Sequence, residues 1–263
     1  MGNTSVCNFI LGIFLCSAVA CDTTFIIHDG ETDSNGNNSD DTATVAPDSE
    51  GGFCDSAAAD VIVCDDFEQE HEGAKTVNGK VSWVTDPSFE GEQALCSQTM
   101  AEQSWACMVY PFAAINRDTL YLSAHIFIPD DTITGNTTLV NLSGQVDESS
   151  EQTFGVDINV SPTRSLDIYV HGNYTRYTSG EKQVPTGRWF CLWGRYSISD
   201  VSGEASFWID DNLVVSTTAS KEAVITGGVS ELRIGIGWTE NGQEQATVYV
   251  DNLILRSSPT ACN

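Results

Sequence analysis

Residues suited to sugar chemistry alternate with apolar ones along three segments of the chain, at 120–128, 154–160 and 166–171. Side chains alternate faces along a β-strand, so each segment predicts one apolar face and one polar face. Flat rings contact the C–H patches of sugars, while carboxylates, amides and imidazoles bind sugar hydroxyls. The polar positions that we predict to share one carbohydrate-binding surface are Tyr121, His125, Asp157, Asn159, Asp167, Tyr169 and His171.

A fourth segment, at 189–198, alternates in the same way, and one of its two faces contains Trp193 and Arg195. We assign both side chains to the same polar surface. The alternative for the whole surface is an ordinary solvated outer face of a sheet, on which a few aromatic residues only support their neighbours.

Short strands are the elements that must position these residues. Candidate strands run from 61–67 to 246–256, and Gly, Asn, Asp and Pro mark the breaks between them, as at 129–131 and 210–212. Since no segment has apolar residues at helical spacing over ten positions, the pattern predicts an all-β sandwich or barrel. Two sheets with their apolar faces packed together are the simplest solution.

Three motifs carry a resemblance to a known family. They are GRWFCLWGRYSISDVSGEASFWIDDNLV at 187–214, YVDNLIL at 249–255 and CDDFE at 64–68. Together they resemble the concanavalin A-like lectin/glucanase fold, of the laminin-G-like kind found in bacterial secreted lipoproteins, over about 53–262. The resemblance implies a two-sheet antiparallel jelly-roll sandwich. This fold hosts lectins, lyases, glycosidases and adhesion modules, so the function depends on the site.

Two reactions are compatible with the polar surface. Elimination from a uronate needs a group that neutralises the carboxylate, a base and an acid, and the candidates are His125, Tyr169, His171 and Arg195. Hydrolysis needs two carboxylates ~5 to 10 Å apart, and Asp157 has no Glu two positions away. We expect glycan binding or adhesion without catalysis. A polysaccharide lyase, a glycoside hydrolase and a structural cell-envelope protein are the alternatives.

Calcium is a further expectation, since domains that resemble this one often hold a structural ion where the first and last strands meet. Carboxylate oxygens are the ligands that Ca²⁺ prefers, and Asp65, Asp66, Glu68 and Asp251 are the candidate positions. The alternative is that these acids only cap strand ends and turns.

The chain is strongly acidic, with 37 Asp and Glu against 11 Lys and Arg among 263 residues, and a net charge of −26. A field of this sign repels nucleic acid and polyanionic glycans. We therefore expect no nucleic acid as partner, whereas the polar surface described above predicts a glycan or polysaccharide.

The N-terminus reads as an export segment. An apolar run at 9–20 is too short to span a bilayer and predicts a signal peptide at 1–20. Cys21 directly after Ala20 resembles a bacterial lipobox and is predicted to carry a lipid, although Ala18 replaces the usual Leu. An ordinary secretory signal is the alternative. Residues 21–52 are predicted to be a disordered acidic linker and 53–263 the folded domain, exported and either lipid-anchored in the cell envelope or secreted.

Six of the nine cysteines follow Cys21, and an even number in an exported domain predicts disulfides. Zinc is a poor alternative because no C-x-x-C motif occurs. Fifteen pairings are possible. Local spacing favours Cys54–Cys64 and Cys96–Cys107, which leaves Cys191 to pair with Cys262.

Overall fold

The computed structural model of the protein describes residues 53–54, 59–70, 72–102, 104–116, 118–145, 153–171, 175–198, 203–217, 228–259 and 262. The predicted signal peptide, Cys21 and the linker at 21–52 lie outside these residues. Within the described ranges, no helix has the length and apolar character needed to cross a bilayer.

Eight strands form sheet A, in which every neighbouring pair is antiparallel. In spatial order they are β13 (Asn212–Ser216), β12 (Glu204–Ile209), β11 (Trp189–Ile198), β6 (Asp118–Phe127), β15 (Thr247–Arg256), β4 (Ala94–Thr99) and β3 (Gly79–Val84). The eighth, β1 (Val61–Asp65), pairs with the C-terminal half of β15, while β4 pairs with its N-terminal half.

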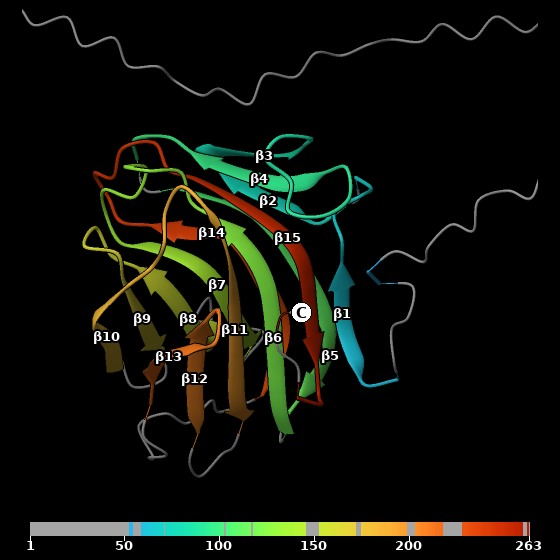
Figure 1. Ribbon diagram of the computed structural model, residues 1–263. Helices are drawn as coiled ribbons and strands as arrows, with labels where there is room; N and C mark the ends of the chain where they lie inside the picture. The colour runs from blue at the N-terminus through green and yellow to red at the C-terminus, as the bar shows by residue number, and fades with distance from the viewer. Residues whose placement is uncertain are drawn as a thin grey trace, which may run out of the picture. The chain divides into compact units, whose positions relative to one another are not determined.

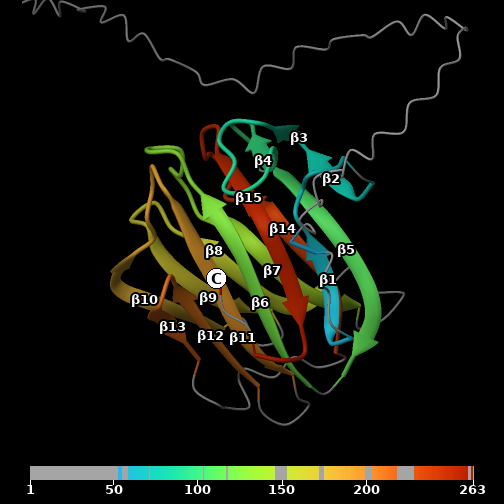
Figure 2. The same ribbon diagram turned by 45° about the vertical axis from the view of Figure 1, so that its right-hand side comes forward.

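Seven strands form sheet B, also antiparallel throughout. In spatial order they are β10 (Thr175–Gln183), β9 (Ser165–Val170), β8 (Thr153–Val160), β7 (Thr137–Gln145), β14 (Val229–Thr239), β5 (Trp105–Ile115) and β2 (Ala74–Val77). Figures 1 and 2 show the two sheets as separate layers, with β6, β11 and β15 in one and β7, β8 and β9 in the other.

The inner faces of both sheets supply the hydrophobic core, and the predicted alternation decides which residues reach it. Leu122 and Ile126 of β6, Ile158 of β8 and Ile168 of β9 are completely buried. Phe190, Leu192 and Tyr196 of β11 are buried with them. The all-β, two-sheet antiparallel jelly-roll sandwich is therefore confirmed. Strand β2 was not predicted, because its four side chains are all exposed and show no alternation.

Two of the three predicted disulfides are confirmed, Cys54–Cys64 and Cys191–Cys262. The second joins a central strand of sheet A to the C-terminal end of the chain. Disulfides are typical of proteins that fold outside the reducing cytosol.

The predicted Cys96–Cys107 disulfide is wrong. Cys96 lies on β4 of sheet A and Cys107 on β5 of sheet B, and both are buried thiols. The chain passes from one sheet to the other between them, so proximity in the sequence does not bring the two sulfurs together. Burial raises the pKa of Cys107 to about 11, which keeps this thiol neutral.

Carboxylates of Asp251 on β15 and of Glu68, which follows β1, hold the loop between β3 and β4. Asp251 accepts hydrogen bonds from the backbone N–H groups of Phe89 and Glu90, at 2.9 and 3.2 Å. Glu68 accepts hydrogen bonds from the N–H groups of Glu92 and Gln93.

The other two positions predicted for calcium also accept hydrogen bonds close to this loop. Asp65 accepts from the N–H of Phe67 and the hydroxyl of Tyr110, and Asp66 accepts from the N–H of Glu68. In the described part of the chain, no group of three or more Asp, Glu, His or Cys side chains is arranged to hold a metal ion. The contacts match the turn-capping alternative, and calcium binding stays a prediction.

A change of pH is expected to act on stability through Asp251. Burial raises the pKa of this carboxyl to about 6, although the N–H groups of Phe89, Glu90 and Asn252 lower it. Because the folded-state pKa lies above the ordinary value of 3.8, the folded protein takes up the proton first as the pH falls. This group therefore adds stability as the pH falls from about 6 to about 4, by about 3 kcal/mol at 1.36 kcal/mol per pKa unit.

The measurement is chemical unfolding at a series of pH values, comparing wild type with Asp251→Asn. The variant retains an acceptor oxygen for the loop and lacks the titrating proton, so the difference in unfolding free energy between the two proteins should change over this interval. A difference independent of pH between 4 and 7 would contradict the assignment.

Candidate functional site

Sheet B places a row of polar side chains side by side across its outer face. The strand register pairs Arg233 of β14 with Asn141 of β7, Asn141 with Asp157 of β8, and Asp157 with Tyr169 of β9. Tyr169 pairs in turn with Arg176 of β10. Since directly paired residues lie on the same face, these five side chains form one continuous row perpendicular to the strands.

A second row runs beside the first. Trp238 of β14 pairs with Thr138 of β7, Thr138 with Asn159 of β8, and Asn159 with Asp167 of β9. The hydroxyl of Thr138 donates a hydrogen bond of 2.6 Å to Asn159 Oδ1. This hydrogen bond fixes the orientation of the Asn159 side-chain amide before any ligand binds.

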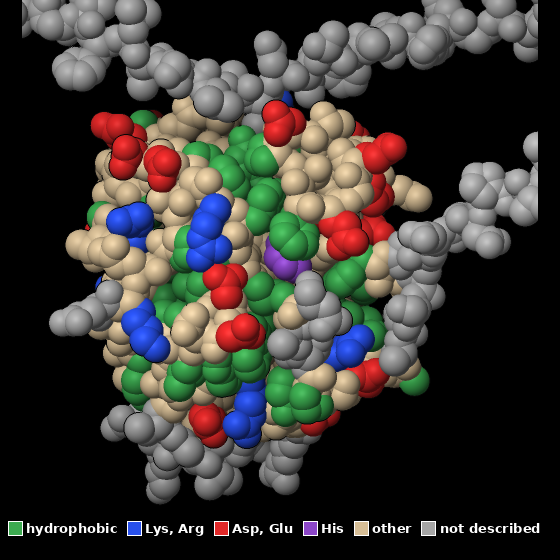
Figure 3. Space-filling model, in the orientation of Figure 1, with side chains coloured by type: hydrophobic (Ala, Val, Ile, Leu, Met, Phe, Trp, Pro, Cys, Tyr) green, Lys and Arg blue, Asp and Glu red, His purple; other side chains and the backbone are tan. Residues whose placement is uncertain are grey.

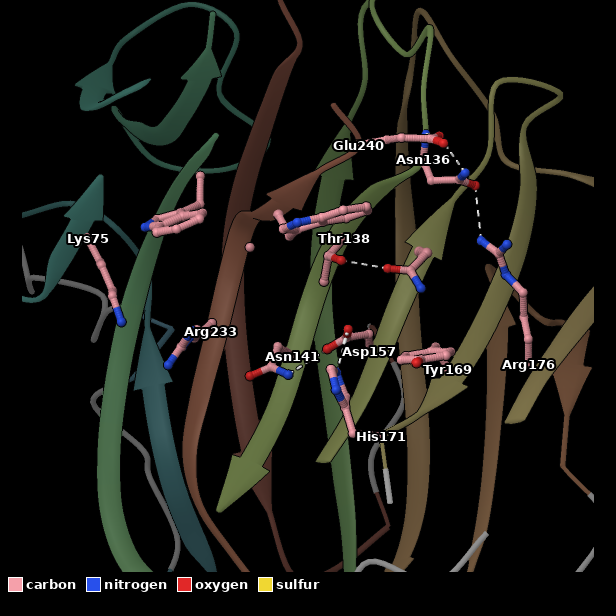
Figure 4. A pocket seen from close by; sticks show the side chains of 14 residues that line it. Lys75, Asn136, Thr138, Asn141, Asp157, Tyr169, His171, Arg176, Arg233 and Glu240 are labelled. Carbon is pink, nitrogen blue, oxygen red and sulfur yellow. Dashed lines mark hydrogen bonds and ion pairs between the residues drawn. The ribbon is translucent and has the colours of Figure 1, made fainter. Parts of the chain in front are cut away.

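Both rows line a pocket of about 490 Å³, to which all seven strands of sheet B or the residues that adjoin them contribute. Figure 4 shows its centre at Asp157 and His171, with Lys75 and Arg233 to one side and Arg176 to the other. Pockets that hold drug-sized ligands typically measure ~300–1,000 Å³. The lining residues are Lys75, Trp105, Asn136, Thr138, Asn141, Asp157, Asn159, Tyr169, His171, Arg176, Arg233, Gly237, Trp238 and Glu240.

An Asp–His pair forms the centre of the pocket. His171 follows β9, and its Nε2 lies 2.7 Å from Asp157 Oδ2. The other oxygen of Asp157 accepts a hydrogen bond of 2.5 Å from Asn141 Nδ2. With Nε2–H donating to the carboxylate, His171 Nδ1 is the basic nitrogen of the neutral ring. The ring of Tyr169 meets that of His171 edge-on, with centroids 5.0 Å apart.

The pKa of His171 is raised above its ordinary value of 6.5. Burial of the ring lowers this pKa, but the hydrogen bond and the negative charge of Asp157 together outweigh burial. Histidine can give or take a proton near neutral pH, so an imidazole held in place by a carboxylate suits the role of general base or acid.

Three of the eleven Lys and Arg residues line this pocket, although the chain is acidic overall. Arg233 donates from Nε to Glu231 at 2.5 Å, which orients its guanidinium. Arg176 forms an ion pair of 2.9 Å with the buried Asp167. Lys75 comes from the exposed edge strand β2.

A hydrogen-bonded chain forms one wall of the pocket. Arg176 donates to Asn136 Oδ1 at 3.0 Å, and the backbone N–H and Nδ2 of Asn136 both donate to Glu240. These contacts lower the pKa of Glu240, so the carboxylate stays ionised. Figure 4 shows the three side chains following one another across the pocket.

The structure divides the nine residues predicted to bind carbohydrate between the two sheets. Four of them line the pocket: Asp157, Asn159, Tyr169 and His171. Asp167 faces the same side and is buried beneath Arg176. The remaining four, on β6 and β11 of sheet A, are Tyr121, His125, Trp193 and Arg195. The single surface predicted for all nine is therefore wrong, because alternation gives the face of each strand and not the sheet to which the strand belongs.

The residues on sheet A make contacts of their own. Figure 3 shows one face of the molecule, on which hydrophobic side chains lie among scattered charged ones. His125 is buried and stacks under Phe89 with centroids 3.6 Å apart, and burial lowers its pKa. Trp193 stacks on Trp208 at 3.8 Å. The predicted lyase set that joined His125 and Arg195 to Tyr169 is wrong, since these residues lie on different sheets.

Several pocket residues were not predicted from the sequence, although the alternation of apolar and polar residues indicates the position of two of them. Asn141 lies between the core residues Val140 and Leu142, and Arg233 lies between Leu232 and Ile234. The same alternation rule would have placed both on an outer face. Lys75 had no such signal, because every side chain of β2 is exposed.

No protein-family model matches the chain, and no curated protein matches it either. Among solved structures, the chain resembles the cellulose induced protein Cip1, with 14% identity and a TM-score of 0.58, over 76% of this chain and 100% of that one. It also resembles an endo-beta-1,4-glucuronan lyase from the fungus Trichoderma reesei, with 13% identity and a TM-score of 0.52, over 69% of this chain and 88% of that one. At these identities the likeness shows the fold alone.

Proposed function

We propose that this protein is a polysaccharide lyase that binds an acidic polysaccharide across the outer face of sheet B and cleaves it by β-elimination. The observation that carries the proposal is the Asp157–His171 pair beside Tyr169, in a pocket that also contains Arg233 and Lys75. Base, acid and cation are the three groups that this reaction needs.

The elimination balances with these groups alone. A base removes the proton from C5 of the uronate, and the C–H electron pair forms the C4=C5 double bond. The C4–O bond breaks, and the departing oxygen takes a proton from the acid. His171 Nδ1 is the proposed base and the hydroxyl of Tyr169 the proposed acid, while Asp157 holds the imidazole in the tautomer that leaves Nδ1 basic.

A cation must stabilise the negative charge that builds up on the uronate carboxylate when the C5 proton leaves. Arg233 is the proposed group, since Glu231 orients its guanidinium and its strand neighbour Asn141 contacts Asp157. Asn141 acts as a positioning residue, because its hydrogen bond fixes the carboxylate that in turn fixes His171.

The acidity of the whole chain does not exclude an acidic substrate. Charges separated by more than about 8 Å are largely screened at physiological salt. A polysaccharide laid across the pocket meets Lys75, Arg176 and Arg233 from three different strands. The nearby carboxylates, Asp157, Asp167, Glu231 and Glu240, each interact with a side chain of the pocket. The likeness to a glucuronan lyase supports the same class of substrate.

Glycan binding without cleavage by the same pocket is the second candidate. Rings of Trp105, Tyr169 and Trp238 line the pocket, and such rings are typical of sugar-binding modules. Export agrees with either function. Lipid anchoring through Cys21, on a linker at 21–52, and a structural role in the cell envelope stay predictions.

The test is incubation of the domain with polyglucuronate, alginate, pectate and a neutral β-glucan. Ultraviolet absorbance detects the unsaturated sugar that elimination creates, and affinity electrophoresis in the same polymers detects binding. We expect absorbance to rise with at least one polyuronate and not with the neutral glucan. Retardation without any rise in absorbance would replace the lyase with the binding module. The absence of both retardation and a rise in absorbance would refute both functions.

A further inference from the structure

Two tryptophans lie at the end of the pocket opposite Arg176. Trp105 belongs to β5, Trp238 to β14, and Lys75 to the edge strand β2 beside β5. Lys75 pairs with Cys107, two residues along β5 from Trp105, so its side chain faces the same side as the indole. The end of the pocket therefore combines two indole rings with one cation.

This end lies well away from the Asp157–His171 pair. His171 adjoins β9, and the strand order from there is β8, β7, β14 and β5. Neighbouring strands are ~4.8 Å apart, so Trp105 lies about 14 Å beyond the strand of Asp157 and about 19 Å from that of His171. A single pyranose ring cannot contact both places, whereas an oligosaccharide laid across the strands can.

Gly237 lines the pocket beside Trp105, and its nearest side-chain neighbour is Thr138. Ile236 pairs with Ala106, so the next position along the two strands brings Gly237 beside Trp105. A Cβ atom at Gly237 would lie 3.3 Å from the methyl group of Thr138, in space that is now open to the pocket. Glycine here leaves room for a flat ring to lie on the sheet.

From this arrangement we infer that Trp105, Trp238 and Lys75 form a separate subsite for one pyranose of the acidic polysaccharide, and that the subsite makes binding depend on chain length. The inference rests on the proposed function. Indole faces stack on the C–H faces of a sugar ring, and the ammonium group of Lys75 pairs with the carboxylate of the same sugar. The Asp157–His171 centre binds the sugar that reacts, and the tryptophan end holds another sugar of the same chain.

The test measures the affinity of a size-graded series of oligouronates by calorimetry. Catalysis is blocked with His171→Ala in every protein compared. We expect affinity to rise by about tenfold, equivalent to about 1.4 kcal/mol, at the length that first reaches Trp105. Adding Trp105→Ala should remove this rise and leave the affinity of the shortest binding oligomer unchanged. Trp105→Phe should restore most of it, because a flat ring returns.

The matched control is Trp193→Phe, which changes a tryptophan on sheet A and should preserve the length dependence. Thermal melting of every variant shows whether its fold is intact. Equal affinity for short and long oligomers in the protein that carries His171→Ala alone, or an equal loss for both when Trp105→Ala is added, would overturn the subsite and leave the proposed function standing. Binding of no oligouronate of any length would instead refute the proposed function.

Discussion

Replacing His171 by alanine is expected to reduce the rate of elimination by a factor of about 10² to 10⁴, the usual contribution of a general base. The imidazole is the group in the pocket best placed to take a proton, since Asp157 holds its Nε2 at 2.7 Å and leaves Nδ1 for the substrate. Affinity for the polysaccharide should change little, because the cations and rings that bind it remain. Initial rates of ultraviolet absorbance and affinity electrophoresis separate the two effects.

His125→Ala is the matched control, since it removes a histidine from the opposite sheet. Its rate should equal that of the wild type at temperatures where both proteins are folded. Asp157→Asn should resemble His171→Ala, because an amide no longer holds the imidazole in the tautomer whose Nδ1 is basic. If His171→Ala retained the wild-type rate, the Asp–His pair would have no part in the chemistry.

The pH dependence follows from the same pair. Asp157 raises the pKa of His171 above 6.5, and a protonated ring cannot accept the C5 proton. The rate should therefore fall as the pH drops through this raised pKa, with the slope of a single proton. Asp157→Asn removes the charge that raises the pKa of His171. The residual activity of that variant should therefore fall at a lower pH than the activity of the wild type.

Replacing Arg233 by alanine is expected to lower the rate by about 10² to 10³, the range found when one preorganised donor to a developing negative charge is removed. Arg233 is oriented by Glu231 and stands next to Asn141 in the row that leads to Asp157. Removing it leaves the substrate carboxylate beside the negative charge of Glu231. The loss should appear in both kcat and KM, measured with the polyuronate that the wild type cleaves fastest.

Arg233→Lys keeps a positive charge and should therefore recover part of the rate. The recovery should be incomplete, because a point charge replaces the planar fork of the guanidinium. The control on the other face is Arg195→Ala, which breaks only a 3.8 Å ion pair with Glu204. A wild-type rate for Arg233→Ala would show that another group neutralises the carboxylate.

The alternation of apolar and polar residues along single strands predicted part of the structure correctly. It placed Ile126, Ile158 and Ile168 in the core, and it placed Asp157 and His171 on an outer face. These are properties of one strand at a time, and the two-residue period of a β-strand is written in the order of the residues. The same rule extended to β14 would also have included Arg233.

The sequence failed where the answer depended on which strands are neighbours. His125 and Tyr169 have the same polar character, yet β6 pairs with β11 and β15 in sheet A while β9 pairs with β8 and β10 in sheet B. Cys96 and Cys107 are close in the chain and lie on different sheets for the same reason.

The order of the residues by itself determined an all-β sandwich and its buried positions, because strand period and turn chemistry are local. Only the tertiary structure decided that Arg233, Asn141, Asp157, Tyr169 and Arg176 stand in one row. Asn141, Asp157, Tyr169 and Arg176 come from β7 to β10, which follow one another in the chain, whereas Arg233 comes from the distant strand β14. Their meeting is set by the pairing of backbone N–H and C=O groups and by the burial of the inner faces, and no local pattern specifies either.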